Sequence, residues 1–313
     1  MTGMTDRFYK SKWGVFNHFL GGDVNSAEEW NEKVNGFDVE KVAKQLHEMG
    51  ASYYFLTIMQ GKRFMCSPNS RYDEIGGIKP GEACSVRDLP MDMYNALSKY
   101  GIDLYLYYTG DGPHKDEVLN KKFGYWDPIN NPVPESFVQK WAYVLEEYAV
   151  RYGDKVKGWW MDGFYDYFYY NNDLMAPYYE AIKKGNPDAL VSFNNGELVR
   201  QYEAEKEYKI DKWYEKAEFT AGEQVDFIHI PESRFANGAQ THMLIPMGIP
   251  LDPSNIGTSW CQPGLKRSPE HIIDFAKKAF ENGVVLTFDI YVDKYGNFDE
   301  SQKSVLKLLN TEK

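Results

Sequence analysis

Several features that define large classes of proteins are missing from this sequence. Among its 313 residues there are only three cysteines, Cys66, Cys84 and Cys261, with no Cys-x-x-Cys pair. This argues against a disulfide framework and a zinc site. No apolar run reaches the about 18 residues of a membrane-spanning helix. The N-terminus lacks the apolar core of a signal peptide, so we expect a cytoplasmic protein, or a periplasmic or secreted one whose leader has been removed.

An excess of positive charge and the common cofactor motifs are missing as well. The formal net charge is −11, which argues against a nucleic-acid partner, because phosphate backbones are bound by basic patches. There is no P-loop, no Gly-x-Gly-x-x-Gly turn after a strand, no His-Glu-x-x-His and no Gly-x-Ser-x-Gly. The six histidines show no ligand spacing within one helix. We therefore expect no cofactor and no metal.

Aromatic residues, in contrast, are abundant. They make up 16% of the chain, with 24 tyrosines and 8 tryptophans, within a hydrophobic content of 43% that suffices for a sizeable core. Aromatic faces suit the apolar faces of sugar rings, so this composition points to a carbohydrate partner. The oligomeric state is left open.

Short apolar runs alternate with amphipathic segments along the chain. The runs predict eight strands, at 13–18, 52–57, 102–108, 156–162, 189–194, 225–230, 241–245 and 284–290. The segments predict helices at 38–49, 88–100, 134–152, 175–184, 268–281 and 299–309. Strands that are apolar on both faces, separated by helices, are typical of a parallel sheet with crossover helices. Eight such units favour a single (β/α)8 TIM-like barrel that forms one domain over residues 1–313.

The stretch 156–170, VKGWWMDGFYDYFYY, is the candidate centre of function. It begins as an apolar strand that ends on Asp162, and Gly163 and a run of aromatics follow. Barrel enzymes carry catalytic groups at the carboxyl ends of their strands. The alternative is that Asp162 caps the next turn and that the aromatics are core residues.

Other acids stand near predicted strand ends. Glu223 precedes the sixth predicted strand, Glu232 follows it, and Asp289 lies on the eighth. A retaining glycosidase needs two carboxyl groups roughly 5–5.5 Å apart, one an ionised nucleophile and the other a proton donor with a raised pKa. Barrel loops near strands four and six can bring two such groups together.

Several stretches, taken in chain order, resemble the α-L-fucosidases of glycoside hydrolase family 29. They are WGVFNHF at 13–19, GASYYFLT at 50–57, VRDLPMDMYNAL at 86–97, WWMDG at 159–163, TAGEQVD at 220–226 and NGVVLTFDIYVDKYGNFDESQ at 282–302. The resemblance implies a retaining exo-α-glycosidase with Asp162 as nucleophile and His18 as a sugar contact. It also implies Glu223 as acid/base, with Glu218 and Glu232 as rivals.

Further sugar contacts are expected from residues near the same strand ends. Trp159 and Trp160 alternate faces on a strand, so one belongs to the core, and Trp160 is our candidate to face the pocket. Tyr165 and Trp260 are candidate stacking platforms, with buried packing as the alternative.

The loop at 59–64, MQGKRF, departs from the family pattern, which places a pair of histidines after the second strand. Gln60 can donate and accept hydrogen bonds in place of a histidine. Lys62 and Arg63 would suit an acidic or sulfated sugar, or they are solvated loop charges. Two alternatives therefore stay open: a related glycosidase that acts on another L-sugar or on a sulfated or acidic polysaccharide, and a non-hydrolytic carbohydrate-binding barrel.

Overall fold

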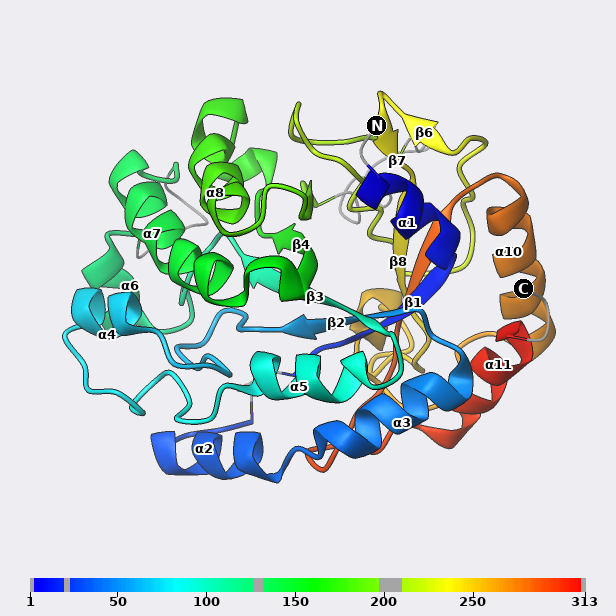
Figure 1. Cartoon of the computed structure of the whole chain (residues 1–313), viewed down its shortest axis with the longest axis horizontal. Coiled ribbons are helices and arrows are strands. Elements are labelled where there is room, and N and C mark those ends of the chain that lie inside the picture. Colours follow the sequence, from blue (N-terminus) through cyan, green and yellow to red (C-terminus); the bar gives the residue numbers. More distant parts are fainter. Residues whose placement is uncertain (1–2, 20–22, 126–131, 197–209, 311–313) are drawn as a thin grey trace.

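A seven-stranded parallel sheet forms the centre of the protein (Figure 1). The computed structural model describes residues 3–19, 23–125, 132–196 and 210–310. The strands follow each other across the sheet in the order β5-β4-β3-β2-β1-β9-β8. They are β1 (Trp13–Asn17), β2 (Tyr53–Thr57), β3 (Asp103–Thr109), β4 (Val156–Asp162), β5 (Leu190–Phe193), β8 (His242–Pro246) and β9 (Val285–Asp289). A short antiparallel pair, β6 (Phe235–Ala236) and β7 (Ala239–Gln240), precedes β8.

Helices surround the curled sheet (Figure 1). They are α1 (Gly3–Ser11), α2 (Ala27–Gly36), α3 (Val39–Met49), α4 (Ser70–Gly76), α5 (Leu89–Ser98), α6 (Glu117–Phe123), α7 (Glu135–Tyr152), α8 (Asn172–Gly185), α10 (Pro269–Glu281) and α11 (Glu300–Asn310). In the outer layer α7 packs on α8, α3 on α5, and α11 on both α3 and α10. Parallel strands inside and helices outside give a TIM-like α/β architecture.

Local sequence patterns correctly predicted most of these strands and helices. Seven of the eight predicted strands are present within one residue at either end. The six predicted helices form as well. The ends of α3 have the expected capping residues: Asp38 accepts a hydrogen bond from the Lys41 amide, and Gly50 ends the helix in the left-handed conformation. Helices α1, α2, α4 and α6 were not predicted, because they are short segments outside the strand–helix repeat.

The prediction of a closed eight-stranded barrel is wrong for the described part of the chain, where the sheet has seven strands and stays open between β5 and β8. Residues 225–230 form no strand. Within this range Asp226 is buried in an ion pair with Arg267. The backbone hydrogen bonds to the edge strand β8 are made by the preceding residues instead, at Gly222 and Gln224. The strand signal of this apolar run was therefore misleading.

The preceding segment, residues 218–224, occupies the gap. The amide of Glu218 donates to the carbonyl of Val191 on β5, and the amide of Gln224 donates to the carbonyl of Leu244 on β8. Isolated parallel bridges link this segment to the β7–β8 region. Gly222 has a φ of +60°, which interrupts a regular strand. The segment therefore connects the two edge strands through separate hydrogen bonds.

Aromatic side chains fill the interior of the curled sheet. One buried cluster contains Phe16, Tyr53, Tyr105, Tyr107, Trp160 and Phe219. Phe8 of α1 enters it with ring centroids 5.2 Å from Tyr53 and 5.1 Å from Phe219. Arg7 anchors the same helix through a two-point ion pair with Asp103, at 2.7 and 2.6 Å. Helix α1 therefore covers the amino-terminal ends of the strands, and the carboxyl ends remain accessible for a functional site.

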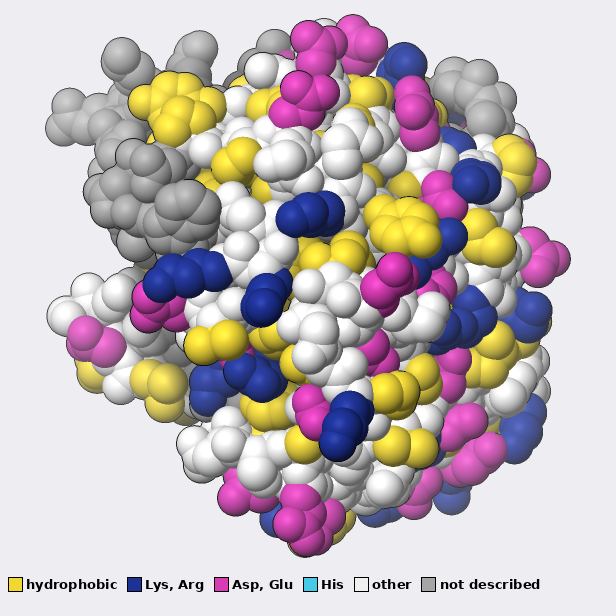
Figure 2. All heavy atoms as spheres, turned by 90° about the vertical axis from the view of Figure 1, so that its left-hand side faces the viewer, with side chains coloured by type: hydrophobic (Ala, Val, Ile, Leu, Met, Phe, Trp, Pro, Cys, Tyr) yellow, Lys and Arg dark blue, Asp and Glu magenta, His cyan; other side chains and the backbone are white. Residues whose placement is uncertain are grey.

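The outer surface carries mixed side chains. On the face shown in Figure 2, acidic, basic and apolar side chains lie among one another. Among the described residues, no helix has both the length and the apolar character needed to cross a membrane.

We predict that Gly222→Ala weakens the fold more than an equivalent change elsewhere. A Cβ at this position would collide with the carbonyl oxygen of His242 on β8, and the backbone is left-handed. We expect the free energy of unfolding to fall by roughly 2–4 kcal/mol. The matched control is Gly77→Ala, which has a similar φ of +64° and no atom within 4 Å of the added Cβ. Chemical denaturation should show that Gly77→Ala lowers the free energy of unfolding by about 1–2 kcal/mol. An equal decrease in both variants would contradict the close contact at Gly222.

Candidate active site

Asp162 lies at the carboxyl end of β4 with 7% of its surface exposed. Its Oδ1 accepts hydrogen bonds from Asn194 Nδ2 at 2.9 Å and from the Tyr165 hydroxyl at 3.2 Å. Its Oδ2 accepts a short hydrogen bond from the Tyr107 hydroxyl and a longer one from Gln60 Nε2, at 3.4 Å. Four donors therefore converge on one buried carboxylate, and hydrogen bonds of this kind favour its ionised form.

The fold brings these donors together from separate parts of the chain. Tyr107 lies on β3, Gln60 follows β2 and Asn194 follows β5. Parallel strands end on the same side of a sheet, so the residues at their carboxyl ends meet there. Tyr165 approaches by a local route, because Gly163 turns the chain directly after Asp162 with a φ of +74°.

Glu223 lies in the segment that occupies the gap in the sheet, next to Leu244 of β8. Its Oε2 accepts a hydrogen bond from Asn194 Nδ2 at 2.5 Å, and the same nitrogen lies 2.9 Å from Asp162 Oδ1. The two carboxylate oxygens can therefore lie no further apart than the sum of these distances. This limit agrees with the roughly 5–5.5 Å between carboxyl groups in retaining glycosidases and is smaller than the roughly 6.5–9.5 Å in inverting ones.

The surroundings raise the pKa of both carboxyl groups, and burial is the largest cause in each case. Burial raises the pKa of Asp162, and the hydrogen bonds from Tyr107 and Asn194 partly offset the rise. Burial and the nearby negative charge of Asp162 raise the pKa of Glu223 to about 8, against a lowering by the hydrogen bond from Asn194. Since four donors favour the ionised form of Asp162, and burial with the charge of Asp162 raises the pKa of Glu223 to about 8, we infer that Glu223 holds the proton at neutral pH.

A cavity of about 730 Å³ is lined in part by His18, Gln60 and Trp260. Asp162 and Glu223 are not among its lining residues, and Gln60, whose amide donates to Asp162, connects the cavity to the acid pair. The Nδ1 atom of His18 lies 3.0 Å from Oδ1 of the fully buried Asp289. The other Asp289 oxygen accepts the amide of Cys261 at 2.5 Å. Asp289 therefore fixes both the His18 ring and the loop that carries Trp260. A carboxylate at Nδ1 favours a proton there, which leaves Nε2 for a ligand.

The predicted aromatic contacts lie at different depths. Trp160 is 3% exposed, stacks on Tyr107 with centroids 5.6 Å apart, and donates its indole N–H to the carbonyl of Ala221. It therefore lies mainly in the interior, beneath Asp162. Tyr165 is half-buried and stacks on the exposed Tyr167 at 5.0 Å. Trp260 is half-buried and meets His18 edge-on at 5.5 Å.

The rival acids lie away from this pair. Glu218 forms an ion pair with Lys183 at 2.6 Å and accepts the amide of Val191 at 3.0 Å. Glu232 is exposed and lines a separate cavity with His229. Over the part of the chain that the structure describes, no group of three or more His, Cys, Asp or Glu residues could hold a metal ion.

Two residues of the site were missed by sequence reasoning. Asn194 contacts both acids, and Tyr107 contacts Asp162. A signal for them was present, because Asn194 ends the fifth predicted strand and Tyr107 lies next to the end of the third. A polar residue where a parallel strand ends deserves the same weight as an acid there.

Several solved structures share this fold. An α-L-fucosidase from Lactobacillus casei, in complex with its α-L-fucose product, matches with a TM-score of 0.64 and 16% identity, over 99% of this chain and 99% of that chain. A family 29 α-L-fucosidase from Bacteroides thetaiotaomicron matches at 0.65 and 16% identity, over 100% and 73% of the two chains. An endo-fucoidan hydrolase of family 107 matches at 0.66 and 15% identity, over 97% and 92%.

Sequence comparisons add nothing to these matches, since no protein-family model and no curated protein matches the chain. At identities of 15–16% the structural likeness bears on the fold alone. The protein therefore shares the overall chain fold of these fucosidases and of this fucoidan hydrolase.

Proposed function

We propose that this protein is a retaining glycoside hydrolase that cleaves α-L-fucosidic bonds. The observation that carries the proposal is the pair of carboxyl groups bridged by one amide nitrogen, one rich in hydrogen-bond donors and the other with a raised pKa. Retaining glycosidases need this combination of one ionised and one protonated carboxyl group at short range.

In this mechanism Asp162 is the nucleophile and Glu223 the acid/base. The ionised carboxylate of Asp162 attacks the anomeric carbon, while Glu223 gives its proton to the departing glycosidic oxygen. Glu223, now ionised, then takes a proton from water as the water oxygen attacks the anomeric carbon, and the bond from that carbon to Asp162 breaks to release the Asp162 carboxylate. Asn194 and Tyr107 hold the nucleophile in place and keep it ionised.

Structural neighbours support this assignment. One of them is a family 29 α-L-fucosidase in which a covalent intermediate was trapped with 2-fluoro-fucosyl fluoride and a glutamate-to-glutamine mutant. That structure matches this chain with a TM-score of 0.65 over 100% of its length. Our proposal likewise requires a covalent intermediate and gives a role to a glutamate.

The sugar would lie in the cavity that Gln60 connects to the acid pair. His18, Gln60 and Trp260 line this cavity, so we propose that they contact the substrate, with Tyr165 at the nucleophile. Gln60 could contact both the sugar and the nucleophile, since its side-chain amide already donates to Asp162. Trp160 would support the site indirectly, by stacking on Tyr107.

Cleavage within a polymer is a second candidate. Two further neighbours are endo-fucoidan hydrolases of family 107, with TM-scores of 0.71 and 0.72. The cavity that holds His18 extends to the loop at 291–295, which leaves room for more than one sugar. Exo cleavage releases fucose and endo cleavage releases oligosaccharides, so product analysis separates the two.

We predict that the protein hydrolyses para-nitrophenyl α-L-fucopyranoside and that Asp162→Ala lowers kcat/KM by on the order of 10⁴-fold. Glu223→Gln should cost roughly 10²-fold, the lower end for a general acid, because nitrophenolate leaves readily without a proton. The matched control is Glu232→Gln, the same change on an exposed side chain, which should keep full activity. Full activity in Asp162→Ala would refute the mechanism.

We also predict a bell-shaped pH profile of kcat/KM that falls above about pH 8, where Glu223 loses its proton. The hydrogen bonds from Asn194 lower the pKa of both acids, so Asn194→Ala should move both limbs to higher pH. Tyr107→Phe removes a donor from Asp162 alone and should raise chiefly the acid limb. A basic limb that stays in place in Asn194→Ala would contradict the bridge.

A further inference from the structure

The cavity lined by His18, Gln60 and Trp260 continues along a wall formed by residues 291–295, which follow β9. This wall carries two tyrosines, the half-buried Tyr291 and the exposed Tyr295. The proposed mechanism uses neither of them. Aromatic faces suit the apolar faces of sugar rings, so the wall offers a surface for a second sugar residue.

A tight hairpin at 292–298 holds Tyr295 in place. Its two ends, Val292 and Phe298, form an antiparallel bridge. Within the hairpin, Oδ1 of Asp293 accepts the amide of Tyr295 at 2.8 Å and the amide of Asn297 at 2.9 Å. These hydrogen bonds come from the backbone of Tyr295 and Asn297, so the turn does not depend on the side chain at position 295.

One buried glutamine joins this wall to the loop that carries Trp260. Gln302 of α11 is fully buried, and its Oε1 accepts the amide of Tyr291 at 2.8 Å. Its Nε2 donates to the carbonyl of Gln262 at 2.8 Å, and Gln262 also lines the cavity. The two walls are therefore held relative to each other by buried hydrogen bonds. A ligand between such walls has to order little of the protein when it binds.

The ring of Tyr295 keeps free surface although a cation lies over it. The ammonium group of Lys294 is 5.2 Å from the ring centroid, and Tyr295 is nevertheless 54% exposed. A cation over an aromatic ring interacts with one of its faces. The remaining surface is available for stacking.

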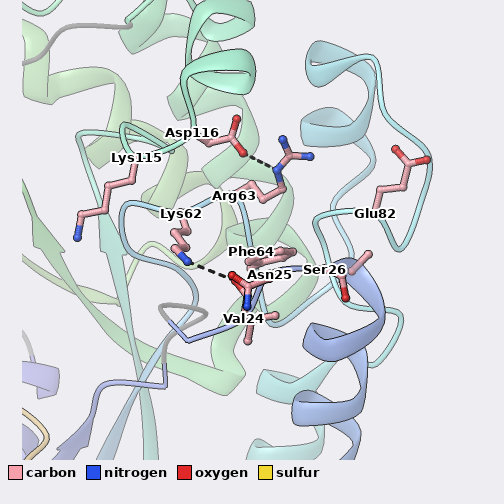
Figure 3. A pocket seen from close by; sticks show the side chains of 10 residues that line it. Val24, Asn25, Ser26, Lys62, Arg63, Phe64, Glu82, Lys115 and Asp116 are labelled. Carbon is pink, nitrogen blue, oxygen red and sulfur yellow. Dashed lines mark hydrogen bonds and ion pairs between the residues drawn. The ribbon is translucent and has the colours of Figure 1, made fainter.

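A smaller cavity, of about 560 Å³, lies beside the loop at 59–64 and has a charged wall (Figure 3). On this wall Arg63 forms an ion pair with Asp116, and Lys62 donates to the carbonyl of Val24 at 3.3 Å. Both cations therefore already contact protein groups. An oligosaccharide that extends from the nucleophile past Gln60 finds open aromatic surface along 291–295 instead.

We propose that the wall at 291–295 is a second sugar subsite, in which Tyr295 stacks on the sugar residue joined to the fucose whose bond lies at Asp162. The inference rests on the proposed function, and it names the substrate as an oligosaccharide or a longer chain rather than a simple fucoside. The fucose itself lies at His18 and Gln60. Gln60 links the two subsites to the chemistry, because it lines the cavity and donates to Asp162.

The test measures binding by calorimetry in an Asp162→Asn background, which lacks the proposed nucleophile. The three probes are methyl α-L-fucopyranoside, an α-L-linked fucotriose and a disaccharide of α-L-fucose on galactose. We expect at least one of the two larger probes to bind roughly three- to tenfold more tightly than the methyl fucoside. Larger probes that bind no more tightly than the methyl fucoside would overturn the proposal.

Tyr295→Ala should remove most of this gain and leave binding of the methyl fucoside unchanged. Tyr295→Phe keeps the ring and should keep the gain, which separates stacking from a hydrogen bond of the hydroxyl. The matched control is Tyr143→Ala, the same change at an exposed tyrosine of α7 that does not line the cavity. A full gain in Tyr295→Ala, or the same loss in Tyr143→Ala, would refute the subsite.

The two proposals fail in different ways. Hydrolysis of the aryl fucoside, without any gain that depends on Tyr295, would remove the second subsite and leave the proposed function. A gain that depends on Tyr295, in a protein that cleaves no fucoside, would remove the catalytic assignment and leave the subsite.

Discussion

One amide group, that of Asn194, lies between two buried acids, and the proposed chemistry depends on this contact. Two carboxylates that are both ionised at such short range in a protein interior repel each other strongly. The amide donates to both, at 2.9 Å to Asp162 and at 2.5 Å to Glu223. The remaining repulsion is relieved when one acid keeps a proton, and the four donors around Asp162 assign that proton to Glu223. In the proposed mechanism, the proton donor and the nucleophile therefore both result from this one contact.

The open sheet is part of the same arrangement. A regular eighth strand between β5 and β8 would place alternate side chains inward and outward along its whole length. Instead, residues 218–224 are tied to both edges by separate hydrogen bonds and turn at Gly222. This turn stands directly before Glu223, so the irregular backbone presents its carboxyl group to Asn194. The departure from the ideal barrel therefore occurs where the proposed acid/base is needed.

The loop at 59–64 joins the acid pair to its surroundings. Gln60 contacts Asp162 and lines one cavity, while Lys62 and Arg63 line the next. A change in this loop would thus alter the nucleophile's neighbour and the charge of the adjoining wall together. Under the proposed function, we therefore expect the departure of this loop from the fucosidase pattern to affect the choice of substrate.

Local sequence determined the elements and the position of Asp162. The strand at 156–162, the cap at Asp38 and the turn at Gly50 depend on residues close in sequence, so a single sequence reveals them. Only the tertiary structure decided which groups meet Asp162. Asn194, Tyr107 and Gln60 come from three other strand ends, and no local pattern states which ends lie side by side. The apolar run at 225–230 was misread for the same reason, because the edge strands β5 and β8 form their hydrogen bonds with the preceding segment, at Glu218 and Gln224.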